Sequence, residues 1–136
     1  MDETLLLEIV TPEEIAHSEK VQMVTLPGIE GIIGILPGHE PLMTRMVPGE
    51  LVIRKGGQDT LMAVGEGLVE ITSGRVAILT DLAIEARDID EAKAEESRRR
   101  AAARLREQIS AEETAAVNAS LARALAQLSV KRRHRT

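Results

Sequence analysis

Apolar and polar residues alternate in short runs along the first eighty residues, which predicts β-strands. Positions 5, 7 and 9 are apolar on one side of a strand, and Val69 and Ile71 alternate with Glu70 and Thr72. Strands at roughly eight- to twelve-residue spacing, separated by turn residues, are typical of an antiparallel sandwich or barrel. Seven runs have this character: TLLLEIV, VQMVTLP, GIIGIL, ELVIRK, DTLMAVG, LVEITSG and RVAILT.

Two glycine-containing pairs stand where hairpin turns are expected. Gly56 and Gly57 separate two of these runs, and Ser73 and Gly74 separate two others. Tight hairpin turns need residues that adopt a positive φ, and glycine does so without steric cost. We therefore expect glycine at a positive φ in both turns.

After Leu82 the pattern changes to that of two helices. Asp88, followed by Glu91, predicts a first helix starting near Ile89, because an acidic cap accepts hydrogen bonds from the free amides of the first turn. Ser110 and Glu113 form an S-x-x-E capping pattern, which predicts a second helix from about residue 111 after a break near residue 109.

The two predicted helices have thin apolar stripes. The first helix offers an alanine-rich line of Ala94, Ala101, Leu105 and Ile109. The second helix carries a stripe of Val117, Leu121, Leu125 and Leu128. Because buried alanine contributes little free energy, we expect this helical hairpin to be only marginally stable beside the sandwich. A segment held this weakly can be released.

The fold class is therefore α+β, with an N-terminal antiparallel β-sandwich followed by a C-terminal two-helix hairpin. All ten glycines and all five prolines lie at or before Gly74, while the remainder is rich in Ala, Arg and Glu. We place the sandwich domain at residues 1–86 and the hairpin domain at residues 87–136.

Composition narrows the possible functions. The 136 residues suffice for one ordinary domain and a small appendage. The absence of cysteine excludes disulfides, zinc-thiolate sites and thiol catalysis. A net charge of −5 and the absence of aromatic residues argue against nucleic acid as a partner. The acidic start and short apolar runs lead us to expect neither a targeting peptide nor a spanning helix.

The glycine-rich segment PGIEGIIGILPGHEPLM, residues 27–43, invites three interpretations: a phosphate cradle, a metal or catalytic site, or a contact surface. Its G-x-x-G-x-x-G spacing differs from a dinucleotide fingerprint, and no Lys-Ser or Lys-Thr completes a P-loop. His39 has no second ligand at metal-binding spacing and no nucleophile to activate. We expect hairpin turns here, with His39 in an exposed loop making backbone hydrogen bonds or contacting a partner. No catalytic or metal-binding residue is predicted.

Basic residues gather at the C-terminus, in the run KRRHR of residues 131–135. Such a run is usually a solvated helix end, and its functional interpretation is an electrostatic contact with an acidic protein surface. Asp90 and Lys93 are neighbours on the first helix, where such pairs usually form only local ion pairs.

Several segments, in this order and at this spacing, resemble the epsilon subunit of the bacterial F-type ATP synthase, and the similarity covers nearly the whole chain. The segments are LPGIEGIIGILPGHEPLMTRMVPGELVI, VGEGLVEITSGRVAILTDLAIEARDIDEAKA and SLARALAQL. The resemblance implies a ten-stranded β-sandwich, two helices and no catalysis by the chain alone.

The resemblance also implies partners and a location. The sandwich would bind the gamma subunit and the polar loops of the membrane c-ring as part of the rotor. The helical tail would either fold onto the sandwich or extend into the head of alpha and beta subunits and block ATP hydrolysis. The chain would be peripheral on the cytoplasmic side of the bacterial inner membrane and would reach the membrane only through the complex. Whether the coupling ion is H⁺ or Na⁺ depends on other chains.

By resemblance, the segment from Ile29 to Leu42 is a loop that faces the c-ring. The contact residues would be Glu30, Ile32, Ile33, His39 and Glu40. Related subunits often carry an acidic residue in the middle of this loop, where Ile32 and Ile33 stand here, so a more apolar contact is expected. Glu40, where a small residue is common, would restore a charge nearby.

Some members of this family bind ATP in the folded tail through a motif like I/L-D-x-x-R-A. The matching residues 89–94 read IDEAKA, with Lys93 in place of arginine. Lysine keeps the charge but lacks the planar fork that grips a phosphate. With Asp90, Arg100 and Arg123 as the other candidates, we expect ATP binding to be weak or absent and no cofactor to be required.

The residues available for an inhibitory contact are the cations of the second helix, which we call the basic tail: Arg123, Lys131, Arg132, Arg133 and Arg135. An alternative function is a free-standing nucleotide-binding module, in which the glycine-rich segment or the arginine-rich helix holds a nucleotide and the hairpin closes over it. Tight ATP binding by the isolated chain would favour that alternative.

Overall fold

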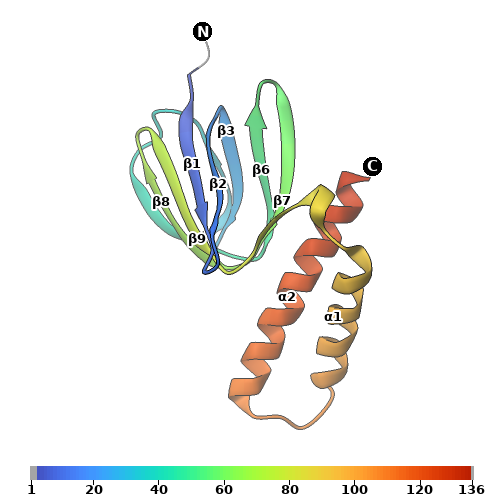
Figure 1. Cartoon of the computed structure of the whole chain (residues 1–136). Helices are drawn as coiled ribbons and strands as arrows, with labels where there is room; N and C mark the ends of the chain where they lie inside the picture. Colours follow the sequence, from blue (N-terminus) through green and yellow to red (C-terminus); the bar gives the residue numbers. More distant parts are fainter. Residues whose placement is uncertain (1–2, 136) are drawn as a thin grey trace.

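The computed structural model describes residues 3–135, which form a β-sandwich followed by two helices packed side by side (Figure 1). Ten strands make up the sandwich: β1 (Leu5–Val10), β2 (Ile15–Val21), β3 (Met23–Gly28), β4 (Gly31–Ile35), β5 (Leu42–Met46), β6 (Gly49–Lys55), β7 (Gln58–Val64), β8 (Gly67–Thr72), β9 (Arg75–Thr80) and β10 (Ala83–Glu85). A 3₁₀ turn, η1 (Ala86–Asp88), leads to α1 (Glu91–Arg104) and α2 (Ala111–His134). The α+β architecture expected from the sequence is confirmed.

The strands follow the order β10-β7-β6-β3-β5-β8-β9-β1-β2, with β4 attached to β3. All pairings are antiparallel except that of β1 with β9. β2, at one end of this order, approaches β6, where Lys55 donates a hydrogen bond of 3.1 Å to Glu19 of β2. Burial raises the pKa of Glu19, but hydrogen bonds from His17 and Lys55 outweigh it and hold the pKa below its usual value.

An entirely aliphatic core lies between the layers of the sandwich. Sixteen Leu, Ile, Val and Met side chains from the strands form one buried cluster. On β1, Leu5, Leu7 and Ile9 point into it and their neighbours are half-buried, while Val69 and Ile71 of β8 alternate with exposed residues. The predicted alternation is therefore confirmed for both strands. The interior of the sandwich is thus built from Leu, Ile, Val and Met side chains, without an aromatic ring.

Three strands were missing from the expectation based on apolar runs: β2, β5 and β10. The sequence of β2, IAHSEKV, is mostly polar because an edge strand needs to bury little of either face. The sequence of β5, LMTRM, exposes Leu42 and Met43, so its apolar residues do not mark a buried face. At three residues, β10 is too short to show a period.

The two predicted hairpin turns differ in backbone conformation. Gly56 and Gly57 have φ angles of 60° and 77°, as expected of the turn between β6 and β7. Gly74 forms a turn with Ser73 between β8 and β9, but its φ is not positive. The prediction of a left-handed glycine at Gly74 is therefore wrong, because this turn closes without that conformation.

The first helix starts two residues later than predicted. Asp88 ends the 3₁₀ turn, Ile89 is extended, and Asp90 caps α1 by accepting a hydrogen bond of 3.2 Å from the amide of Lys93. The side chain of Ile89 is only 4% exposed and packs with Ala86 and Val130. Because this packing keeps the backbone extended at Ile89, the cap passes from Asp88 to Asp90.

The second helix starts as predicted, since Ser110 accepts a hydrogen bond of 3.0 Å from the amide of Glu113 and α2 begins at the next residue. The first helix ends earlier than expected, at Arg104, and a loop replaces its last predicted turn. The expected apolar stripe of α2 is only partly buried: Leu128 is 2% exposed but Leu125 is 48% exposed. The reason is that α2 contacts α1, β6 and β7 at once, so its buried surface is not one narrow stripe.

We predict that amide hydrogen exchange is about tenfold faster or more across residues 89–130 than across residues 68–79. The helices bury mainly alanine, whereas β8 and β9 lie in the aliphatic core and bury branched side chains. Exchange monitored by mass spectrometry on the isolated chain measures this directly. Equal protection of the two segments would remove the argument for a labile hairpin.

Candidate functional sites

The glycine-rich segment is a hairpin and a loop in the structure, where a single loop from Ile29 to Leu42 was expected. Ile29 and Glu30 form the turn between β3 and β4, and residues 36–41 connect β4 to β5. Gly28 and Gly31 face each other across the turn, and a Cβ added at Gly28 would lie 2.8 Å from the carbonyl oxygen of Gly31. The expectation of hairpin turns with close backbone approach is therefore confirmed, and the expectation of one continuous loop is wrong.

The isoleucines at the middle of this segment point to opposite sides of β4. Ile32 is 80% exposed, whereas Ile33 is half-buried and packs against the aliphatic core. Successive side chains of a strand must alternate in this way. Of the two residues, only Ile32 is available to a partner on the outer side.

His39 makes backbone hydrogen bonds in the loop between β4 and β5, as expected, but it is half-buried there and not exposed. Its amide donates to the carbonyl of Leu36 at 3.1 Å, and its ring Nδ1 lies 2.7 Å from the carbonyl oxygen of Glu40. Since a carbonyl only accepts, Nδ1 carries the proton in this contact. A contact of His39 with a partner remains a prediction.

The five candidate contact residues lie along β4 and at both of its ends. Glu30 stands in the turn before the strand, and His39 and Glu40 follow it in the next loop. Five residues at about 3.3 Å each separate the two ends by roughly 16 Å. Within the described residues β4 pairs only with β3, so these residues follow a strand with one free edge, and among them the side chain of Ile33 faces the core.

The structure does not gather the four ATP-binding candidates into one site. Asp90 caps α1, and Arg123 pairs with Asp81 of the sandwich at 3.2 Å. Lys93 is exposed on the first turn of α1. Ten residues of helix place Arg100 about 15 Å along the axis from Asp90. Arg100 lines an open space of ≈ 470 Å³ between the helices, and the other lining residues include none of the remaining candidates.

The cations of the basic tail are tied to the chain's own groups. Lys131 donates to the carbonyl of Ala86 at 3.0 Å, and Arg133 pairs with Glu50 of β6 at 2.7 Å. Together with the pair of Arg123 and Asp81, these contacts join α2 to the sandwich. In this conformation the cations of the tail are therefore paired within the chain, although the side chains of Arg132, Arg133 and Arg135 remain more than half exposed.

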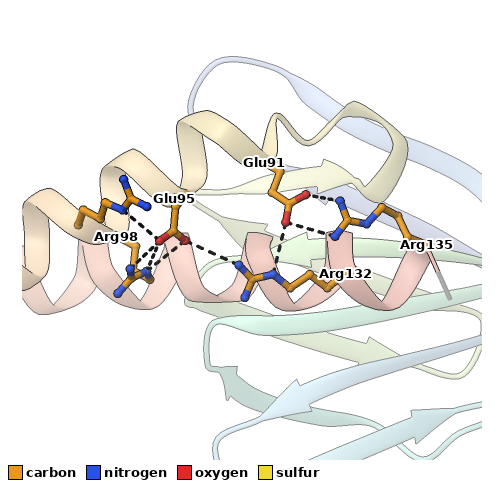
Figure 2. A network of polar contacts seen from close by, with 6 residues as sticks. Glu91, Glu95, Arg98, Arg132 and Arg135 are labelled. Atoms are coloured by element: carbon orange, nitrogen blue, oxygen red, sulfur yellow. Dashed lines mark hydrogen bonds and ion pairs between the residues drawn. The ribbon is translucent and has the colours of Figure 1, made fainter.

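Arg132 and Arg135 point from α2 towards two carboxylates of α1, Glu91 and Glu95, which we call the acidic pair (Figure 2). Arg132 lies 3.3 Å from Glu91 and 3.7 Å from Glu95, and Arg135 contacts both carboxylate oxygens of Glu91. Hydrogen bonding from Arg98 holds the pKa of Glu95 below its usual value, against an opposing effect of desolvation.

Sequence reasoning missed the acidic partners Glu50, Asp81, Glu91 and Glu95. The pairs of Glu95 with Arg98 and Arg99 follow from three- and four-residue spacing on one helix, so this part could have been found. The contacts between helices depend on how the hairpin packs. Glu91 and Glu95 are four residues apart, and Arg132 and Arg135 are three apart. Each set therefore shares one helix face, and this spacing is the only sign in the sequence that the two sets could meet.

Two further searches concern residues 3–135. No group of three or more His, Asp and Glu residues there could hold a metal ion. No helix in this part of the chain combines the length and the apolar character that a membrane crossing requires.

Comparison with protein families covers almost the whole chain. Residues 4–86 match the family described as "ATP synthase, Delta/Epsilon chain, beta-sandwich domain". Residues 87–132 match the family described as "ATP synthase, Delta/Epsilon chain, long alpha-helix domain".

Two similar proteins are both named "ATP synthase epsilon chain". The one from Herpetosiphon aurantiacus is 43% identical over 129 residues, which cover 95% of each chain. The one from Halorhodospira halophila is 44% identical over 127 residues, covering 92% of this chain and 90% of that protein.

Solved structures show the same fold at lower identity. A chain of the Euglena gracilis mitochondrial ATP synthase, in a structure of OSCP, F1 and the c-ring, matches with a TM-score of 0.77 and 23% identity over 93% of this chain and 79% of that one. A chain of the Tetrahymena thermophila mitochondrial ATP synthase central stalk and c-ring matches with a TM-score of 0.65 and 12% identity, covering 99% and 98%.

We predict that Gly28→Ala lowers the free energy of unfolding by about 1–3 kcal/mol, because the added Cβ meets backbone that cannot move without opening the hairpin of β3 and β4. The matched control is Gly74→Ala, where nothing lies within 4 Å and φ is not left-handed. This control should be neutral or stabilising by less than about 1 kcal/mol. Urea unfolding of both variants measures the difference, and equal stability would contradict the predicted close approach at Gly28.

Proposed function

Because the chain belongs to the ATP synthase delta/epsilon chain family, we propose that it is a central-stalk subunit of a bacterial F-type ATP synthase. In this role it couples ion translocation through the c-ring to ATP synthesis and restrains ATP hydrolysis through its helices. The observation that carries the proposal is the family match over both parts of the chain, residues 4–86 and 87–132. The first range contains the ten strands of the sandwich, and the second contains α1 and most of α2 (Figure 1).

The sandwich is the proposed rotor-binding part, with the gamma subunit and the polar loops of the c-ring as its partners. The line of candidate residues along β4 supports this assignment, because a free strand edge with an 80% exposed Ile32 and charged turns at both ends suits contact with another chain. The exposed side chain of Ile32 makes part of this contact apolar. The chain is then peripheral, on the cytoplasmic side of the inner membrane, and is held there by its partners.

The helical hairpin is the proposed regulatory part. The 24 residues of α2 measure about 36 Å along the helix axis at 1.5 Å per residue, which would carry the basic tail far from the sandwich on extension. Extended towards the alpha and beta subunits, the tail would present several cations to an acidic surface. Its anchors in the folded state are exposed ion pairs, which are individually weak, and one small apolar cluster that includes Ile89 and Val130.

A free-standing nucleotide-binding module is supported less well. The geometry leaves Asp90 occupied as a helix cap, Arg123 paired with Asp81, and Arg100 about 15 Å from Asp90 along the helix. We infer that any regulatory binding of ATP to this conformation is weak. Calorimetry with ATP on the isolated chain distinguishes the two functions, since tight binding without a partner would favour the module.

Deletion of everything after Ile109 should leave binding to gamma intact and raise ATP hydrolysis by the assembled enzyme several-fold. The expected reason is that the deletion removes α2 and the basic tail while the sandwich keeps its own aliphatic core. Hydrolysis is measured after reconstitution into enzyme depleted of its epsilon subunit, with assembly verified by co-purification with gamma.

The matched control replaces only the five cations of the basic tail by alanine, which should reproduce part of the increase, more visibly at low salt because ions screen exposed charges. Unchanged hydrolysis in both variants would confine the role of the chain to coupling. Failure of the full chain to bind gamma would contradict the proposed function itself.

A further inference from the structure

The acidic pair occupies the same guanidinium groups that an inhibitory contact would need. Arg135 directs Nη1 to one oxygen of Glu91 and Nη2 to the other, at 3.4 Å for the second contact. Arg132 uses Nε towards Glu91 at 3.3 Å and Nη2 towards Glu95 at 3.7 Å. Figure 2 shows that these arginines approach the two carboxylates from the facing helix.

We propose that the acidic pair is an internal mimic of the acidic partner surface: it holds the basic tail in the folded hairpin, and a partner must displace it before the tail can inhibit. This inference rests on the proposed function and names how that function is regulated. Both Nη groups of Arg135 fork onto Glu91, so the folded contact and an inhibitory contact through the same atoms exclude each other.

The strength of the contact suits a reversible switch. The side chain of Glu91 is 28% exposed, and those of Arg132 and Arg135 are 57% exposed. Ion pairs in such surroundings are individually weak, and water screens them. A partner carboxylate can therefore replace Glu91 without the cost of leaving a buried charge unpaired.

Glu91 is the residue best placed to control release. Arg133 pairs with Glu50 on the sandwich, and Lys131 donates to a backbone carbonyl, so neither of these contacts uses α1. Glu95 is shared with Arg98 and Arg99 of its own helix. Glu91 has both of its ion-pair partners, Arg132 and Arg135, on the opposite helix.

The inference predicts effects of opposite sign for the two sides of one contact. Glu91→Gln removes the competitor and leaves the inhibitory groups in place, so the tail should extend more often and ATP hydrolysis by the assembled enzyme should fall. Replacing Arg132 and Arg135 by glutamine also loosens the hairpin but removes the inhibitory groups, so hydrolysis should rise. If the contact were purely structural, replacing Glu91 and replacing the two arginines would change the rate of hydrolysis in the same direction.

The position of the tail is measured with two spin labels, at Ser73→Cys in the β8–β9 turn and Ser129→Cys on α2. Both serines are exposed, and the sequence contains no cysteine to interfere. In the labelled full chain within the assembled enzyme, Glu91→Gln should raise the ratio of extended to folded tail about two- to ten-fold, from the loss of two exposed ion pairs.

Glu112→Gln is the matched control. Glu112 is an exposed acid in the first turn of α2, as Glu91 is in the first turn of α1, so both changes remove a charge from a helix N-terminus. Of these two glutamates, Glu91 is the one with ion-pair partners on the facing helix. In addition, Glu91→Gln combined with Arg135→Gln should shift the tail by less than the sum of the two single changes, because both act on one contact.

The outcomes separate this inference from the proposed function. The proposal of an internal mimic would be overturned if the ratio of extended to folded tail were the same for Glu91→Gln and Glu112→Gln. Additive effects of Glu91→Gln and Arg135→Gln in the double variant would overturn it as well. An outward shift of the tail with lower hydrolysis supports it. An outward shift with unchanged hydrolysis would support the contact with the acidic pair but contradict inhibition by the tail, and with it that part of the proposed function.

Discussion

The position of the helical hairpin depends on one small apolar cluster between α2 and the sandwich, made by Ala63, Ala86, Ile89 and Val130. Ile89 and Val130 are its larger members, and burial of two such side chains contributes about 3–6 kcal/mol at most. The cluster sets where α1 begins, because Ile89 stays extended to fill it, and it holds the end of α2 beside η1. The charged contacts around it then decide how readily the helix leaves.

The sandwich and the hairpin are stabilised by different interactions. The sandwich buries a continuous cluster of branched and unbranched aliphatic side chains, so loss of the hairpin need not unfold it. The hairpin buries alanines and a few larger residues, and adds exposed ion pairs. This division of the core suits the proposed function, in which the sandwich contacts the rotor and the less firmly held hairpin extends towards the catalytic head.

Much of the fold could be predicted from local patterns. Alternation in β1 and β8, the glycine pair at residues 56–57 and the cap at Ser110 each depend on neighbouring residues, and each prediction is confirmed. The start of α1 could not be predicted from its neighbours, because Ile89 responds to Val130, which lies forty-one residues away in the chain. The acidic partners of the basic tail could not be predicted for the same reason, because Glu50 and Glu91 come close to it only through tertiary packing.

The central claim is that the tail must leave the sandwich before it can act, and a reversible tether tests this most directly. Glu50 and Arg133 pair at 2.7 Å in the folded state, so cysteines at these two positions of the otherwise cysteine-free chain can be joined by a short, reducible crosslinker in the assembled enzyme. Our account predicts that the tethered enzyme hydrolyses ATP without inhibition and that reduction restores inhibition. Equal inhibition with the tether closed and open would show that release of α2 is not required.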